Sequence, residues 1–374
     1  MKVLIATVTA GAGHLQAAAA VREAWPLLRP DDEVSQVDVL DHVPKLQRKV
    51  YVEGYVTLIE NAPELWGYLF KKTDDVKMLR RLAKWRGEIA RHSNRSFARL
   101  LREQAPDVVV STHYLPVEIL AAMRRRHPEF KPFHACVITD FEAHSLWLEQ
   151  QVDLNCVAAP ETRDSLVARG LDAARIEVTG IPIAQRFSGP IDMPALRRAR
   201  GWRDDLPIVL VLGGGFGMGP VAEVLEAINQ LKQPVQTVVV AGRNEKLRAD
   251  LAAREWSHPT DVFGYVTNMH ELMAASDIIL SKPGGLTTSE ALALGKPLFI
   301  LNPIPGQEAA NSDYLLERGA AVKVNRSEDV TSRLEELLGS ARLKQLSRAA
   351  AKLGRPDSAR AVCEAIQRRS TKLS

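Results

Sequence analysis

The chain has few cysteines and no long apolar run. Its three cysteines, Cys136, Cys156 and Cys363, fit no metal-ligand spacing and leave an odd one over, so neither a disulfide framework nor a zinc site is expected. No stretch approaches the roughly 18 consecutive apolar residues of a membrane-spanning helix. The apolar start at residues 3–8 is too short for a secretory signal and leads into a glycine turn. These features favour a protein of the reducing cytoplasm.

Three common motifs are incomplete or missing. The glycine turn at residues 11–13 suggests dinucleotide binding with Asp38 as the ribose ligand, but Gln16 stands where the third glycine belongs. The glycine loop at residues 213–219 lacks the GK[ST] ending of a Walker loop. No Asp-x-Asp pair occurs, so chelation of a metal–nucleotide complex has no evident ligands. We therefore predict that the protein requires neither a metal nor another cofactor.

Positive charge is concentrated in one segment. Residues 45–102 contain 14 Lys and Arg against 6 Asp and Glu, a balance of +8, although the whole chain has a net charge of only +4. Interleaved basic and aromatic residues on helices are typical of a surface that binds anionic lipid, and no motif for nucleic acid accompanies them. A merely solvated basic face is the alternative. The candidates for contact with a lipid surface, and with a substrate bound there, are Tyr51, Tyr55, Trp66, Tyr68, Phe70, Lys71 and Lys72.

The length of 374 residues predicts two domains, because a single hydrophobic core rarely grows so large. Short apolar runs alternate with helical segments, which is typical of parallel sheets with helices on both faces. We expect an N-terminal domain at residues 1–187, a linker rich in Pro, Gly and Arg at 188–202, and a C-terminal domain at 200–354. A last helix within residues 355–374 should return to the N-terminal domain.

In the N-terminal half, polar residues follow the strands. His14 begins a helix after the first glycine turn, where the helix dipole would lower its pKa and keep the ring neutral, able to accept a proton. The alternative is that His14 only caps the helix. Asp140 follows another strand directly and would orient His14, touch an acceptor or cap the next segment. His113 ends a third strand and would either line the cleft or satisfy the loop backbone.

The C-terminal half has the pattern of a phosphate site followed by hydroxyl-binding groups. A buried strand is broken by a Pro-Gly-Gly turn at residues 283–285, and a helix follows. Free N–H groups and the dipole make such a turn an anion site. Glu290 lies one turn inside that helix, near enough to accept hydrogen bonds from sugar hydroxyls, and a polar loop after the next strand offers Gln307, Glu308 and Asn311. This order predicts a nucleotide-sugar site; an ordinary strand-to-helix turn is the alternative.

Five motifs carry a resemblance to a known family. They are GAGH at residues 11–14, TDF at 139–141, GGGFG at 213–217, KPGGLTTSEAL at 282–292 and PGQEAAN at 305–311. In this order they resemble the UDP-sugar glycosyltransferases with two Rossmann-like domains, above all the monogalactosyldiacylglycerol synthases and the processive diacylglycerol glycosyltransferases. The peptidoglycan N-acetylglucosaminyltransferase is a more distant relative. The resemblance implies an α/β protein of two Rossmann-like domains facing across a cleft, the GT-B fold.

The resemblance also implies an activity. It is the inverting transfer of a hexose, galactose or glucose, from a UDP-sugar to diacylglycerol at the membrane surface, with His14 as the base and Asp140 beside it. Tyr265 would stack on the nucleobase and Val266 would offer its backbone. Where the family often has an arginine, this chain has Ala184, with Arg186 two residues further on. The expected donor-binding residues are Gly213, Gly214, Gly215, Tyr265, Val266, Gly284, Gly285, Leu286, Thr287, Glu290, Gln307, Glu308 and Asn311.

Three other functions remain compatible with the donor half. A glycosyltransferase with a polyprenyl-linked or soluble acceptor would leave the basic, aromatic segment unexplained. A UDP-sugar epimerase would need acid and base groups around the bound sugar. A non-catalytic sensor would bind a UDP-sugar and transfer nothing. For the glycolipid enzyme, we expect a cytoplasmic protein attached peripherally to the inner face of the cell membrane.

Overall fold

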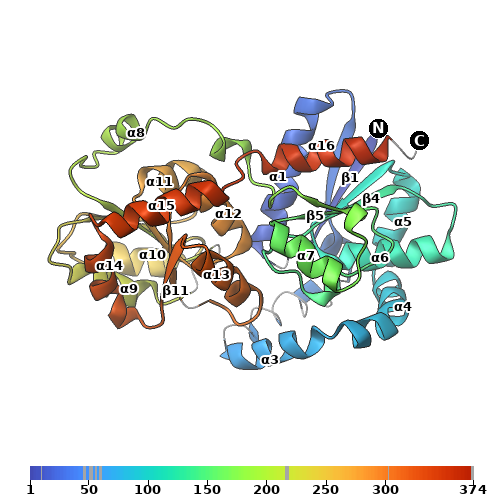
Figure 1. Ribbon diagram of the computed structural model, residues 1–374, viewed down its shortest axis with the longest axis horizontal. Helices are drawn as coiled ribbons and strands as arrows, with labels where there is room; N and C mark the ends of the chain where they lie inside the picture. The colour runs from blue at the N-terminus through green and yellow to red at the C-terminus, as the bar shows by residue number, and fades with distance from the viewer. Residues whose placement is uncertain are drawn as a thin grey trace. The chain divides into compact units, whose positions relative to one another are not determined.

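The computed structural model describes residues 1–9, 11–44, 48–49, 54, 57–58, 61–214, 219–301 and 303–371. Of the predicted contact residues, Tyr51, Tyr55 and Gly215 lie outside this part of the chain. Contacts divide the protein into two units. The first comprises Met1–Gln185, Ile304–Gln307 and Asp357–Ser374, and the second comprises Arg186–Pro303 and Glu308–Pro356. Each unit is a parallel sheet with helices on both faces (Figure 1), which confirms the prediction of two Rossmann-like domains.

The sheet of the first unit has the strand order β2-β1-β3-β4-β5-β6, and every pair is parallel. Its central strands are continuous apolar runs, as expected where helices cover both faces of a sheet. The strands are β1 (Lys2–Thr7), β2 (Glu33–Asp38), β3 (Val108–Ser111), β4 (Phe133–Val137), β5 (Leu154–Val157) and β6 (Ile176–Val178). The chain changes its direction of travel across the sheet between β1 and β3. In open α/β sheets, ligands bind beyond the carboxyl ends of the strands at this point.

Helices cover both faces of the first sheet. Helices α1 and α16 pack on one face and α5 and α6 on the other, and Ser358 at the start of α16 accepts the Ile183 N–H. The helices are α1 (Ala12–Leu28), α3 (Pro63–Thr73), α4 (Val76–Ser93), α5 (Arg95–Gln104), α6 (Tyr114–Arg126), α7 (Pro160–Ala168) and α16 (Ser358–Ser370). Short 3-10 turns are η1 (Val39–His42), η2 (Ser145–Trp147), η3 (Ala173–Arg175) and η4 (Gln185–Phe187), the last reaching the second unit.

The sheet of the second unit repeats this design with the order β12-β11-β10-β7-β8-β9. The strands are β7 (Ile208–Leu212), β8 (Gln236–Val240), β9 (Thr260–Phe263), β10 (Ile278–Ser281), β11 (Leu298–Leu301) and β12 (Ala321–Val324). Here the direction of travel reverses between β7 and β10, which pair in parallel. The glycine turn that follows β10 therefore lies at the second unit's own ligand-binding position.

Two predicted loops of this unit are helical. The expected linker contains α8 (Met193–Ala199), which begins where Asp192 accepts the Ala195 N–H and is held to the unit by an ion pair between Arg197 and Asp277. The expected polar loop after β11 is the start of α13 (Gln307–Glu317). The remaining helices are α9 (Val221–Asn229), α10 (Glu245–Ala252), α11 (Met269–Ala275), α12 (Gly285–Ala293), η5 (Ser327–Asp329), α14 (Val330–Leu337) and α15 (Ala341–Leu353).

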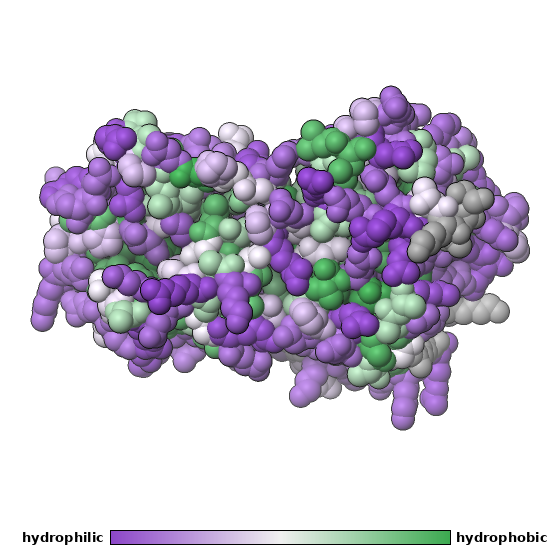
Figure 2. All heavy atoms as spheres, turned by 45° about the horizontal axis from the view of Figure 1, so that its top comes forward, coloured by the Kyte–Doolittle hydropathy of each residue, from purple (hydrophilic) through white to green (hydrophobic). Residues whose placement is uncertain are grey.

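The surface of the protein is mainly hydrophilic on the face drawn in Figure 2, where apolar side chains form separate patches. Within the described parts of the chain, none of the helices combines the length and the apolar character needed to cross a bilayer.

Candidate active site

His14 lies in the first turn of α1, beyond the carboxyl end of β1. Its Nδ1 is 2.8 Å from the Thr112 carbonyl oxygen and 3.0 Å from the Thr139 hydroxyl oxygen. A carbonyl oxygen only accepts, so Nδ1 carries the hydrogen and Nε2 has an unprotonated lone pair. The partners follow β3, which is next to β1 in the sheet, and β4, which is next to β3. The fold thus fixes the tautomer that a proton acceptor needs.

Aromatic rings surround His14. The ring of His113 lies edge-on at 4.8 Å between centroids, and that of Trp147 lies at 6.5 Å. Burial lowers the pKa of His14 from 6.5 to about 4, and the hydrogen bond with Thr112 only partly opposes this effect. The direction is the predicted one, but the main cause is loss of solvent rather than the helix dipole. The imidazole is therefore neutral, with Nε2 unprotonated, throughout the neutral pH range.

Two neighbouring residues have local structural roles. His113 is almost fully buried, and its Nδ1 accepts the Leu115 N–H at the start of α6. This bond matches one of the two roles predicted for His113, that of satisfying the loop backbone. Asp38 accepts hydrogen bonds from the backbone and hydroxyl of Thr9 and from the Leu40 N–H. It therefore fixes the loop after β1 and caps η1, which leaves the dinucleotide interpretation without its ribose ligand.

Asp140 lies three residues beyond the end of β4 and is half-buried at the same edge of the sheet. The described contacts at Nδ1 of His14, however, come from Thr112 and from Thr139, the residue before Asp140. These two positioning groups were missed by sequence reasoning. The TDF motif marked the segment, but only the pairing of β3 with β4 shows that both threonines reach the same ring.

In the second unit, three predicted donor segments follow neighbouring strands. The glycine loop follows β7, the Pro-Gly-Gly turn follows β10, and α13 follows β11. Because carboxyl ends of parallel strands meet at one edge, the sheet brings these segments together. The first intrahelical bond of α12 joins the Thr288 N–H to the Gly284 carbonyl. The preceding N–H groups, from Gly285, Leu286 and Thr287, belong to the helix N-terminus, which is where an anion site was predicted.

Glu290 lies on α12, just beyond this anion site. Burial raises the pKa of its carboxyl group from 4.5 to about 8, and the positive charge of Arg186 acts in the opposite direction. Arg186 also lowers the pKa of His270, after burial of that ring. The guanidinium of Arg186 is therefore close enough to act electrostatically on both Glu290 and His270. Arg186 lies two residues after Ala184, the position at which the family often has an arginine.

Two predicted donor residues have their polar groups engaged within the protein. The Gly213 N–H donates to the Val240 carbonyl and extends the pairing of β7 with β8, so this amide is not available to a phosphate. Asn311 is fully buried, and its Nδ2 donates to the Pro283 carbonyl at 3.0 Å. It therefore supports the backbone of the glycine turn. Gly214 is exposed, with a φ of 71°.

The other predicted groups lie at strand or helix ends. Gln307 and Glu308 form the first turn of α13, and both are half-buried. Tyr265 follows β9 with 57% of its surface exposed, and the guanidinium of Arg243 lies 5.3 Å from the centre of its ring. Val266 is the next residue and is half-buried. An exposed tyrosine steadied by a cation is suited to stacking on a nucleobase.

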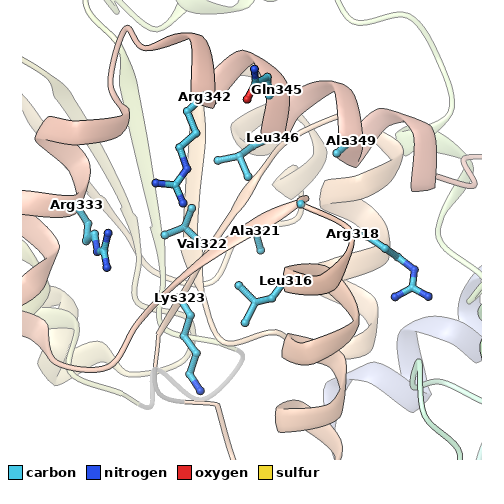
Figure 3. Close-up of a pocket in the computed structure, with 11 residues that line it drawn as sticks. Leu316, Arg318, Ala321, Val322, Lys323, Arg333, Arg342, Gln345, Leu346 and Ala349 are labelled. Carbon is cyan, nitrogen blue, oxygen red and sulfur yellow. The ribbon is translucent and has the colours of Figure 1, made fainter.

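A separate hollow of about 590 Å³ lies along the edge strand β12 (Figure 3). Its lining includes four cationic side chains, Arg318, Lys323, Arg333 and Arg342, but none of the predicted donor residues. Two of these, Arg333 and Arg342, are paired with Glu336. Among the residues that the structure describes, no three or more His, Cys, Asp or Glu side chains are grouped as metal ligands.

Helices α3 and α4 present apolar side chains to solvent. On α4, Leu82, Trp85 and Ile89 are 41%, 69% and 47% exposed and follow the spacing of one helical stripe. On α3, Leu65 and Tyr68 are 50% and 61% exposed. The aromatic residues of this basic segment therefore divide. Phe97 is part of the core, Trp66 and Phe70 are half-buried against each other, and Tyr68 and Trp85 face outward.

Comparison with family models identifies both halves of the chain. The model described as monogalactosyldiacylglycerol (MGDG) synthase matches residues 14–183, and the model described as glycosyl transferases group 1 matches residues 192–353. A processive diacylglycerol beta-glucosyltransferase of Bacillus cereus (strain AH187) is 30% identical over 376 residues, with 98% of this chain and 93% of the relative covered.

Solved structures show the same fold. MurG of Acinetobacter baumannii has a TM-score of 0.63 at 18% identity, with 98% of this chain and 99% of that chain covered. Anabaena Alr3699/HepE in complex with UDP-glucose has a TM-score of 0.55 at 13% identity, with 100% and 99% covered. These likenesses confirm the GT-B type of fold. The chain belongs to the family of the monogalactosyldiacylglycerol synthases and processive diacylglycerol glucosyltransferases, and it is a glycosyltransferase.

Proposed function

We propose that the protein transfers a hexose from a UDP-sugar to diacylglycerol at a membrane surface, with inversion at the anomeric carbon. The observation that carries the proposal is the fixed tautomer of His14, whose unprotonated Nε2 lies beyond the strand ends in the half of the chain that matches monogalactosyldiacylglycerol synthase. The relatives named for diacylglycerol glucosylation support the acceptor. The structural neighbour with bound UDP-glucose supports the donor.

The proposed reaction is a single in-line displacement. The acceptor hydroxyl oxygen forms a bond to the anomeric carbon while the bond from that carbon to the diphosphate oxygen breaks, and the hydroxyl proton moves to Nε2 of His14. With a pKa near 4 in the free protein, His14 is available but weakly basic. An anionic donor bound within reach would raise this pKa and strengthen the base. Asp140 is proposed as a second polar group of the acceptor site.

The donor half supplies binding and stabilisation of the leaving group. The first-turn N–H groups of α12 would bind the diphosphate, whose charge grows as the sugar leaves. Glu290 would accept hydrogen bonds from the ribose hydroxyls, Tyr265 would stack on the base beside the Val266 backbone, and Gln307 and Glu308 would bind the sugar. We propose that these groups suffice without a metal ion. Retention of full activity in excess EDTA is the expected result.

The proposed membrane contact is formed by α3 and α4. Their exposed apolar residues include Tyr68 and Trp85, and Lys71 and Lys72 are exposed at the end of α3. The Lys72 ammonium group lies 5.7 Å from the centre of the Tyr68 ring. Aromatic and basic groups presented together favour an anionic bilayer over water. We infer peripheral attachment to the inner face of the cell membrane.

Product analysis tests the proposed function. The protein is incubated with labelled UDP-glucose or UDP-galactose and vesicles that contain diacylglycerol, and the lipids are separated by thin-layer chromatography. Labelled glycolipid that requires diacylglycerol supports the proposal, and the labelled sugar identifies the hexose. Sugar conversion without an acceptor would indicate an epimerase, and binding without turnover would indicate a sensor.

The relation between His14 and Asp140 has its own test. If the two act as one unit, the double alanine variant should be little slower than the slower single variant, because the effects of substituting residues that act together do not add. If the two losses multiply, Asp140 contributes independently, for instance by contact with the acceptor.

A further inference from the structure

The carboxyl end of α3 is attached to the turn at residues 143–147 through His144. Only 6% of His144 is exposed; its Nδ1 accepts the Leu146 N–H at 3.1 Å, and its Nε2 lies 3.0 Å from the Phe70 carbonyl oxygen. A ring that accepts at Nδ1 and donates at Nε2 is neutral. The Phe70 ring also packs on that of His144, with centroids 4.4 Å apart. One side chain thus caps η2 and holds α3.

Asp74, the residue after α3, forms a second attachment to the same turn. Its carboxylate accepts the Ser145 N–H at 2.6 Å and a hydrogen bond from Arg169 at 3.1 Å. Arg169 also donates to the Ala143 carbonyl at 2.9 Å. Charge-assisted bonds of this kind are stronger than neutral ones. The end of α3 and the turn therefore move together.

The turn leads directly to the ring environment of His14. Trp147, the last residue of η2, is 5% exposed, and its ring lies 6.5 Å from that of His14 and 6.4 Å from that of His113. All these residues belong to the first unit. Packed side chains and hydrogen bonds therefore form an unbroken path from α3 to His14.

The two ends of this path face different surroundings. The outer side of α3 exposes Leu65, Tyr68 and Leu69 to solvent, whereas its carboxyl end is fixed to the turn. A lipid surface that binds the exposed side restrains the helix. A restraint on α3 reaches Trp147 because the attachment is made by directional bonds. A reacting group misplaced by about 1 Å can lose about 10²-fold in rate, so small shifts at Trp147 matter.

We propose that the α3 junction, formed by Phe70, Asp74, His144, Ser145 and Arg169, couples lipid binding on α3 to the position of Trp147 and His14. His144 and Asp74 are positioning residues in this scheme, and they act on the acceptor reaction through Trp147. The enzyme then turns over faster when diacylglycerol is presented in a bilayer than when it is monomeric. This inference rests on the proposed function, since it requires diacylglycerol as the acceptor.

Two substitutions at His144 separate the coupling from simple support of the turn. In His144→Asn, the carboxamide oxygen can still accept the Leu146 N–H as an N-cap, but the shorter side chain cannot reach the Phe70 carbonyl. His144→Ala removes both bonds. Asp74→Asn keeps an acceptor for the Ser145 N–H and weakens the attachment of Arg169. The asparagine variant at His144 is thus the informative one, and thermal unfolding verifies that it is folded.

The experiment compares two presentations of the acceptor. One is long-chain diacylglycerol in phosphatidylglycerol and phosphatidylcholine vesicles, and the other is short-chain diacylglycerol below its aggregation concentration. For His144→Asn we expect kcat on vesicles to fall about tenfold or more, while kcat on the monomeric acceptor stays within about threefold. UDP affinity and vesicle sedimentation should match the wild type.

Three outcomes would overturn the inference. An unchanged kcat on both acceptors in His144→Asn would show that the Phe70 bond transmits nothing. Equal losses on both acceptors would show that His144 merely supports the site. Wild-type protein that glycosylates neither acceptor would remove the proposed function and the inference together. An active wild type, combined with the same vesicle-to-monomer ratio of kcat in His144→Asn as in wild type, would remove the inference alone.

Discussion

Replacing Glu290 by glutamine tests whether the pKa of this carboxyl group on α12 is raised. The carboxyl group has a pKa of about 8 in the folded protein, against an ordinary value of 4.5. Between these pH values the folded protein holds a proton that the unfolded chain has lost, so stability falls as pH rises through this range. Below 4.5 both states are protonated and the effect is absent. Glutamine resembles the protonated acid and should remove this pH dependence.

The size of the effect follows from the displacement of the pKa. One pKa unit corresponds to about 1.36 kcal/mol, so moving from 4.5 to about 8 sets an upper limit of roughly 5 kcal/mol. Glu290 keeps some solvent exposure, and we therefore expect roughly 2–3 kcal/mol above pH 8. For a domain of this size, about 2–4 °C accompanies each kcal/mol.

Thermal unfolding at pH 5 and pH 8.5 measures this difference. Relative to wild type, Glu290→Gln should gain roughly 5–10 °C in Tm at pH 8.5 but much less at pH 5. A difference in Tm that is the same at both pH values would refute the raised pKa. Calorimetry gives a second readout. If ribose hydroxyls bind the ionised carboxylate, UDP binding near pH 7 releases a proton from wild type but none from the variant, and the variant binds UDP more weakly.

Three further predictions concern the base, the membrane and the packing of α12. His14→Ala should lower kcat by about 10²–10⁴-fold while UDP affinity survives, and the wild-type kcat/KM should rise with pH through about 4; a limb that persists in the variant would exclude His14 as its source. Lys71→Glu should weaken sedimentation with anionic vesicles roughly tenfold to thirtyfold at low salt, whereas Lys323→Glu, a matched charge reversal on β12, should not; equal effects would contradict docking through α3. Gly354→Ala should lower Tm strongly because its Cβ would collide with the α12 backbone, whereas Gly189→Ala, in open space, should not; equal Tm values would contradict this packing.

The sequence was sufficient for features that depend on order along the chain. Buried runs that end in glycine turns or polar residues predicted parallel strands, and the parallel sheets then brought the segments after β7, β10 and β11 to one edge. His14 was identifiable because a glycine turn and a helix start flank it. The raised pKa of Glu290 could not be predicted from the sequence, because it depends on burial by residues that are distant in the sequence.

Other features depend on contacts that no local pattern encodes. Gly213 and Asn311 look like ligand-binding groups in the sequence, but Val240 and Pro283 occupy their N–H groups. Thr112 and Thr139 look ordinary, yet both lie against His14 because β3 and β4 are adjacent strands. The polar segment after β11 has the composition of a loop, because its side chains suit sugar binding. Those side chains equally suit the first turn of a helix.

The most direct test of the proposed reaction is the stoichiometry and stereochemistry of the glycolipid formed from an α-linked UDP-hexose. UDP release and lipid-linked hexose are measured in the same reaction on vesicles with diacylglycerol, and the anomeric configuration is read from the proton coupling constant of the purified product. We expect one UDP per hexose transferred and a β-linked product, as a single displacement assisted by His14 requires. An α-linked product, or UDP release that does not depend on diacylglycerol, would contradict the proposed reaction.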